Sequence, residues 1–104
     1  MISFLNKKKR IRIEMVHIQN LDNKNLTEFW FKLNKNVFNL RINIFSSNKK
    51  DEIITEKELK FFKNKWYMLA GYEDIKDGQK WKFDFTGFID KSSKKFRNII
   101  NYKI

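Results

Sequence analysis

The chain has no cysteine and no proline, and its 104 residues include one alanine and three glycines. Without cysteine there is no disulfide framework, zinc-thiolate site or catalytic thiol, which is compatible with a reducing compartment. The isolated glycines Gly71, Gly78 and Gly87 exclude a glycine-rich loop that cradles phosphate. The absences therefore remove several common kinds of catalytic and cofactor site.

Long apolar runs are also missing. The longest, Trp66 to Ala70, is far shorter than the roughly 20 residues that a membrane-spanning helix needs. The first residues are apolar and then basic, the reverse of the order in a secretory signal. We therefore expect a cytoplasmic protein that has no membrane partner.

Aromatic and aliphatic residues are plentiful. Hydrophobic residues make up 41% of the chain and include 11 Phe and 3 Trp. A chain of this size buries roughly two-thirds of the surface that its unfolded form exposes. We expect residues 1–104 to form a single domain with one core.

The net charge of +11 has two explanations. A strongly basic chain is typical of a protein with a polyanionic partner. The other explanation is drift in an A/T-rich gene, because Lys, Asn, Ile and Phe all have A/T-rich codons and lysine far outnumbers arginine. A phosphate-binding protein should gather its cations in one contiguous region, whereas drift should scatter them.

Alternating polarity predicts strands over residues 9–18, 26–34 and 38–44, and Asn34 to Asn36 predicts a hairpin between the last two. In the first strand, Val16 and Ile18 break the alternation, which suggests a bulge or the strand's end. Thr55 and Glu58 form a capping box, and Leu59, Phe62, Trp66 and Leu69 follow at helical spacing with Gly71 after them. The spacing predicts a helix.

Two more strands are predicted after a hairpin turn at Asp77-Gly78, over residues 79–89 and 96–104. In the segment GQKWKFDFTGFID, residues 78–90, the rings of Trp81, Phe83 and Phe85 share one face and the lysines the other. A base-stacking platform needs exposed rings beside cations, so this is a core strand. The predicted fold class is α+β, a single antiparallel sheet in the order β-β-β-α-β-β with one helix on one face.

No residue pattern predicts catalysis. The single histidine, His17, has no carboxylate of the same strand parity, since Glu14 has the opposite one. The acidic loop with Glu73, Asp74 and Asp77 lacks the ligand spacing of a calcium loop. We expect no enzyme activity, no catalytic residue, no cofactor and no metal.

Two binding surfaces can be proposed from the sequence. Trp30 shares strand parity with charged residues, so we expect it to be substantially exposed and to anchor a protein interface. The predicted partner-binding residues are Trp30, Lys32, Arg41, Lys80 and Lys82. Phosphates would instead be bound by two basic clusters, Lys7, Lys8, Lys9 and Arg10, and Lys91, Lys94, Lys95 and Arg97.

A resemblance to a known family extends over about residues 26–90. It lies in the order of a hairpin, the segment ITEKELKFFKNKW and then the segment WKFDFTGFID. The pattern T-x-x-E-L-x-x-F (Thr55, Glu58, Leu59, Phe62) and the following Gly87 and Ile89 resemble small bacterial immunity proteins. Those proteins neutralise the toxin domains of contact-dependent and related polymorphic toxin systems. Many are acidic because their toxins are basic, so for this basic chain the resemblance implies a toxin with an acidic surface.

Two functions are therefore expected. The first is a non-enzymatic inhibitor or immunity-type protein that binds an acidic protein partner, a toxin domain, through an open sheet face and a basic rim, as a monomer or weak dimer. The alternative is a small basic protein that binds nucleic acid through its Lys and Arg clusters.

Overall fold

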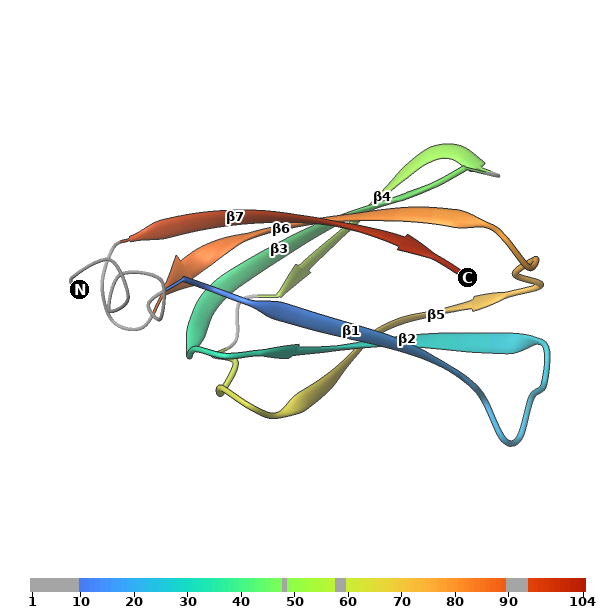
Figure 1. Ribbon diagram of the computed structural model, residues 1–104, viewed down its shortest axis with the longest axis horizontal. Coiled ribbons are helices and arrows are strands. Elements are labelled where there is room, and N and C mark those ends of the chain that lie inside the picture. The colour runs from blue at the N-terminus through green and yellow to red at the C-terminus, as the bar shows by residue number, and fades with distance from the viewer. Residues whose placement is uncertain (1–9, 48, 58–59, 90–93) are drawn as a thin grey trace, which may run out of the picture.

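The protein is a sandwich of two antiparallel β-sheets (Figure 1). The computed structural model describes residues 10–47, 49–57, 60–89 and 94–104. The smaller sheet has the strand order β1-β2-β5, with β1 at Ile13–Gln19, β2 at Leu26–Leu33 and β5 at Trp66–Glu73. The larger sheet has the order β4-β3-β6-β7, with β3 at Val37–Ser46, β4 at Lys49–Lys57, β6 at Lys80–Ile89 and β7 at Lys95–Lys103.

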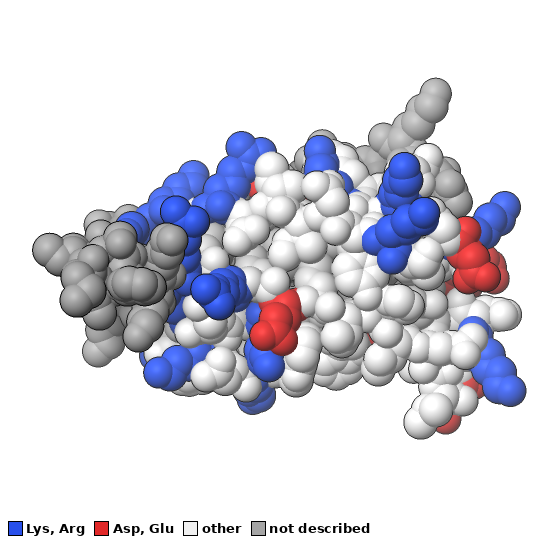
Figure 2. Space-filling model, in the orientation of Figure 1, with Lys and Arg blue, Asp and Glu red and all other residues white. Residues whose placement is uncertain are grey.

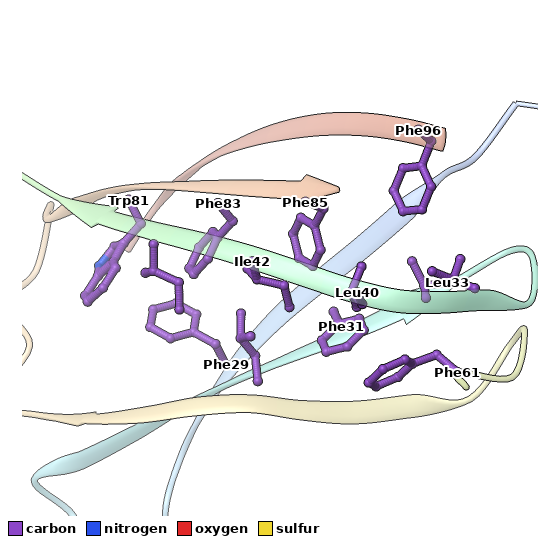
Figure 3. Close-up of a cluster of buried hydrophobic side chains, with 13 residues drawn as sticks. Phe29, Phe31, Leu33, Leu40, Ile42, Phe61, Trp81, Phe83, Phe85 and Phe96 are labelled. Atoms are coloured by element: carbon purple, nitrogen blue, oxygen red, sulfur yellow. The ribbon is translucent and has the colours of Figure 1, made fainter. Parts of the chain in front are cut away.

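The core fills the space between the sheets with aromatic rings from β2 and β6 (Figure 3). Phe29 of the smaller sheet packs on Trp81 and Phe83 of the larger one, with ring centroids 4.9 and 5.1 Å apart. Phe31 packs on Phe85 at 5.6 Å. The aliphatic side chains of β3 complete the layer, namely Val37, Leu40, Ile42 and Ile44. The abundance of phenylalanine therefore serves the contact between two sheets.

Several predicted strands are confirmed. Trp81, Phe83 and Phe85 are buried, while Lys80 and Lys82 of the same strand are exposed, so residues 78–90 do contain a core strand. The predicted strands over residues 26–34, 38–44 and 96–104 correspond to β2, β3 and β7. Their alternation was readable because one face of each strand is buried and the other is not.

The predicted α+β class, the single sheet and the helix are wrong. The described residues contain no helix, and hence no helix long and apolar enough to cross a membrane. Thr55 of the expected capping box lies in β4, and Glu58 and Leu59 lie outside the described residues. Phe62 precedes the turn Lys63-Asn64 that leads into β5, and Asn64 in this turn has a φ of 62°.

The β structure has a physical reason in this segment. The β-branched run Ile53, Ile54 and Thr55 loses less side-chain freedom in a strand than in a helix. Each of the three residues pairs with a residue of β3 in the antiparallel register. Pairing with a neighbouring strand thus outweighed the helical spacing of the apolar residues.

The two predicted hairpins are also wrong, although both turns exist. The segment 34–36 leads from β2 in one sheet to β3 in the other, and Asp77-Gly78 lies between β5 and β6, which are again in different sheets. Gly78 does use its conformational freedom, with a φ of 81°. A turn signal reports a chain reversal, and it does not say which strand the chain then pairs with.

Candidate functional site

The strand registers bring four segments together at one end of the sandwich. Ile13 pairs with Leu33, Val37 with Ile89, and Phe88 with Lys95, so β1, β3 and β7 begin where β2 and β6 end. Phe61, which precedes β5, forms a bridge with Val37. We call these four segments, residues 10–12, 34–36, 60–65 and 94–95, the basic end.

Half-buried and exposed cations gather at the basic end. Its segments contain no Asp or Glu and carry eight basic side chains: Arg10, Arg12, Lys35, Lys60, Lys63, Lys65, Lys94 and Lys95. Figure 2 shows blue side chains concentrated at this end, beside the grey atoms. Because none of these segments carries a negative side chain, the eight positive charges together favour binding of an anion.

Asparagine side chains hold the basic end together. Asn34 accepts a hydrogen bond from the Arg12 amide at 2.7 Å and donates one to the Arg10 carbonyl at 2.9 Å. The Asn36 side chain accepts one from the Lys63 backbone amide at 2.9 Å, and the backbone amide of Asn64 donates to the Leu33 carbonyl at 2.7 Å. These bonds fix three of the four segments relative to one another.

Aromatic rings are exposed among these cations. Phe62 is 53% exposed, and Trp66, the first residue of β5, is 38% exposed. The Lys60 ammonium lies 5.0 Å from the centre of the Phe62 ring, and that of Lys32 lies 5.0 Å from the Trp66 ring. Exposed rings next to cations are the arrangement that a base-stacking surface requires, and the rings of β6 lack it.

The opposite end of the sandwich has a different charge. Its segments 20–25, 73–79 and 103–104 carry the basic residues Lys24, Lys76 and Lys103 and the acidic residues Asp22, Glu73, Asp74 and Asp77. The turn from β3 to β4 and the start of β6 lie at the same end, because the Ser47 amide donates to the Lys80 carbonyl, and they add Lys49, Lys50 and Lys80. We call this end the mixed end. Acidic side chains among the cations therefore distinguish the mixed end from the segments of the basic end, which have none.

The five predicted partner-binding residues do not share a surface. Trp30 and Lys32 lie on the outer face of the three-stranded sheet, on the side of β2 away from the buried Phe29 and Phe31. The other three, Arg41, Lys80 and Lys82, belong to the four-stranded sheet, whose outer face points the opposite way. A single partner cannot cover all five as one flat contact.

Trp30 is less exposed than the sequence suggests. It is half-buried, and its Nε1 donates a hydrogen bond to Glu28 Oε1 at 3.2 Å. It still lies on the outer face, since its strand neighbours Phe29 and Phe31 are fully buried on the inner one. The expected outward direction of Trp30 is therefore confirmed, and substantial exposure is not.

The predicted phosphate-binding residues are partly brought together. Arg10, Lys94 and Lys95 lie at the basic end, whereas Lys7, Lys8, Lys9 and Lys91 lie outside the described residues. Arg97 is engaged elsewhere: its Nε and Nη2 donate to the two oxygens of Asp84 at 3.1 and 2.8 Å. The segment 60–65 was missed because the expected helix placed its lysines and rings on different sides.

His17 and the acidic loop residues Asp74 and Asp77 lie at the mixed end. His17 Nδ1 shares a hydrogen bond with the Tyr102 hydroxyl at 2.6 Å, which links β1 to β7. His17, Asp74 and Asp77 line a hollow of about 610 Å³ at the mixed end. Among the described residues, no group of three His, Asp or Glu side chains is placed to hold a metal ion.

Comparison with protein-family models, curated proteins and solved structures finds no match. A two-sheet sandwich by itself does not define a function, because the same architecture serves unrelated activities. The function must therefore be argued from the surface.

Proposed function

We propose that this protein is a non-enzymatic nucleic-acid-binding domain that holds a single strand at its basic end. The observation that carries the proposal is the meeting of eight cations and the exposed Phe62 in segments without a single acidic residue. Lysine and arginine at such a surface bind phosphates and release condensed counterions, which favours association. A cytoplasmic location, also a proposal, is compatible with the lack of cysteine.

The position of the charge favours a phosphate ligand over codon drift. Drift raises the number of lysines, but it does not select one end of a fold. Both ends consist of connecting segments, yet within the described segments named above the acidic residues lie at the mixed end. Separation of the two signs is what a binding surface for a polyanion requires.

The exposed rings favour single strands over duplexes. Phe62 and Trp66 offer flat apolar surfaces, and the bases of a single strand are free to stack on them. In a duplex the bases are already stacked on one another. Lys60 and Lys32 lie over the same rings, which places cations close to the phosphates of a stacked nucleotide.

The proposal is tested by fluorescence anisotropy with single strands and duplexes of about 30 nucleotides, at about 50 and 200 mM salt. We expect tighter binding of the single strand and an affinity that falls steeply with salt. Phe62→Ala should weaken single-strand binding by about 1–3 kcal/mol and leave the salt slope unchanged. Leu21→Ala, at a residue of the mixed end that is 96% exposed, is the control. Absence of binding at low salt contradicts the proposal.

An acidic protein, such as the toxin domain expected from the sequence, is the second candidate ligand. The basic end would attract an acidic surface as well as a phosphate chain. Trp30 and Lys32 lie on the sheet face that leads to it, since Lys32 pairs with Trp66 at the start of β5. This candidate requires a stoichiometric complex with an acidic toxin domain that survives nuclease treatment, and loss of that complex on treatment contradicts it.

A further inference from the structure

The outer face of the three-stranded sheet carries a row of apolar side chains. Val16 of β1 pairs with Trp30 of β2, and Trp30 pairs with Met68 of β5, so the three lie side by side across the strands. Val16 and Met68 are 38% and 46% exposed, and Ile18 next along β1 is 47% exposed. The break in alternation at Val16 and Ile18, which suggested a bulge or the strand's end, is no bulge: β1 pairs with β2 in unbroken register to its end at Gln19. We call this surface the apolar face.

A water-facing sheet surface is usually polar, so this face is unusual. The opposite outer face, on the four-stranded sheet, carries charged residues such as Lys82 and the Asp84–Arg97 ion pair. On the apolar face, the charged residues flank the apolar row instead of interrupting it. Lys32 lies on the side of the basic end, and Glu28 lies on the side of the mixed end.

The charged groups of the apolar face have partners within it. Glu28 accepts hydrogen bonds from Trp30 Nε1 at 3.2 Å and from Asn20 Nδ2 at 2.8 Å. Lys32 Nζ lies 3.4 Å from Glu14 and 5.0 Å from the centre of the Trp66 ring. Covering the apolar face would therefore leave few polar groups without a hydrogen-bond partner. This lowers the free-energy cost of removing the face from water.

We propose that the apolar face binds a second copy of this chain, in an antiparallel dimer whose two-fold axis runs along the row Val16–Trp30–Met68. Charge selects this occupant and this orientation. Parallel stacking would bring two basic ends together, whereas a two-fold axis along the row places each basic end beside the partner's mixed end. The same axis puts Lys32 of one copy across from Glu28 of the other.

The shape of the face is compatible with this pairing. Lys32 pairs with Trp66 on one side of the row, and Glu28 pairs with Gly71 on the other. The two-fold axis therefore places the Trp66 ring of one copy over Gly71 of the other, against the flexible side chain of Leu26, which lies beside Gly71. Two such sheets would pack about 10 Å apart with their strands crossing at about 30°.

The small area of the apolar face predicts a weak dimer. Three strands of seven or eight residues cover only about 300 Å² in projection. Two copies would then bury less than the roughly 1,200 Å² at which stable interfaces begin. We expect association in the micromolar range or weaker, so that monomer and dimer are in exchange.

Sedimentation velocity at about 5 to 500 μM protein and 150 mM salt tests the dimer. We expect a concentration-dependent shift towards the dimer. Met68→Lys should weaken it at least tenfold, while Ile99→Lys, on the outer face of the other sheet and equally 46% exposed, should not. A wild-type chain that stays monomeric overturns the proposal and leaves the face to another occupant or to none. So does a dimer that survives Met68→Lys, or one that both variants abolish.

The antiparallel orientation has a separate test. Glu28→Lys and Lys32→Glu each place like charges opposite one another in their own dimers, so each variant alone should associate more weakly. In a mixture of the two variants, opposite charges meet at both contacts, and the heterodimer should form at about the wild-type affinity. The arm that distinguishes the orientations is the separate variants: in a parallel dimer like charges would already meet in the wild type, so variants that associate as well as the wild type overturn the antiparallel orientation. A mixture that associates no better than the separate variants overturns the contact between these charges.

Discussion

At the scale of single residues, asparagine and glycine place the connections of this fold. Asn39 and Asn64 have φ values of 51° and 62°, a left-handed conformation that asparagine tolerates better than most residues. Asn39 lies where the β3–β6 register shifts. Asn34 and Asn36 instead act through their side chains at the basic end. Several of the asparagines therefore have a structural role, whatever the base composition of the gene.

Gly87 is the residue at which a small change should matter most. A Cβ atom there would lie 3.0 Å from Phe96 Cε1, 3.1 Å from Val37 Cγ1 and 3.2 Å from the Phe38 carbonyl oxygen. Because a backbone atom is one of the three, the neighbours cannot all move away. Gly87→Ala should lower the free energy of unfolding by about 1–3 kcal/mol, measured by urea denaturation.

Gly71 provides the matched control for Gly87. Its added Cβ would meet only the flexible side chain of Leu26, at 3.1 Å. Gly71→Ala should therefore cost less than Gly87→Ala. Equal losses in the two variants would show that the packing around Gly87 is looser than described.

At the scale of elements, an ion pair joins β6 and β7 on the outer face of the larger sheet. Asp84 is 7% exposed and takes two hydrogen bonds from Arg97. The hydrogen bond and charge of Arg97, aided by the charge of Lys82, hold the pKa of Asp84 below its ordinary value, although desolvation opposes them. The pair therefore stabilises the contact between the two strands when Asp84 is ionised.

The lowered pKa of Asp84 predicts how stability depends on pH. A carboxyl group whose pKa is lower in the folded state than in the unfolded state stabilises the fold at any pH above its pKa in the unfolded state. This stabilisation is lost as the pH falls through its pKa in the folded state. Asp84→Asn should therefore be less stable than the wild type at pH 7, and the difference should shrink below about pH 4. Urea denaturation at pH 7 and at low pH measures it. A difference that stays constant or grows on acidification contradicts this account.

The elements also show how far the sequence determines the fold. Period-two alternation located β2, β3, β6 and β7, because each has one buried face. Alternation did not locate β4 and β5, because the apolar residues between Thr55 and Leu69 are also spaced as in a helix. It could not assign strands to sheets, because a turn such as Asn34 to Asn36 is compatible with a hairpin and with a crossing between sheets.

At the scale of the whole molecule, the main feature is the gathering of cations at the basic end, whose segments carry no acidic residue. Only part of it was predictable. Arg10, Lys94 and Lys95 were expected in basic clusters, but the segment 60–65 joins them only through strand pairing between residues far apart in sequence. The proposed protein-binding residues Trp30 and Lys82 were placed on one face because a single sheet was assumed. Two sheets put them on opposite sides.

The antiparallel dimer and the basic end have a joint consequence at this scale. A two-fold axis along the apolar row would place the two basic ends at opposite poles of the dimer. A long single strand that reached both poles would bind with an avidity that a short one lacks. In the dimer, Trp66 and Lys32 lie in the interface, so single-strand binding at each pole would rest on Phe62 and the cations of the basic end. The two proposals remain separable, because Met68 and Lys63 lie on different surfaces.

The most direct test of the central claim compares two variants of equal net charge. The basic-end variant replaces three lysines by Glu, at Lys60, Lys63 and Lys65. The mixed-end variant makes the same change at Lys24, Lys76 and Lys103. Single-strand binding of both is measured by fluorescence anisotropy at several salt concentrations. We expect the basic-end variant to lose at least tenfold in affinity and to have a flatter salt dependence, by about 2 in the logarithmic slope, while the mixed-end variant keeps most of both. Equal losses in the two variants would show that the protein binds through its overall charge, and would contradict a site at the basic end.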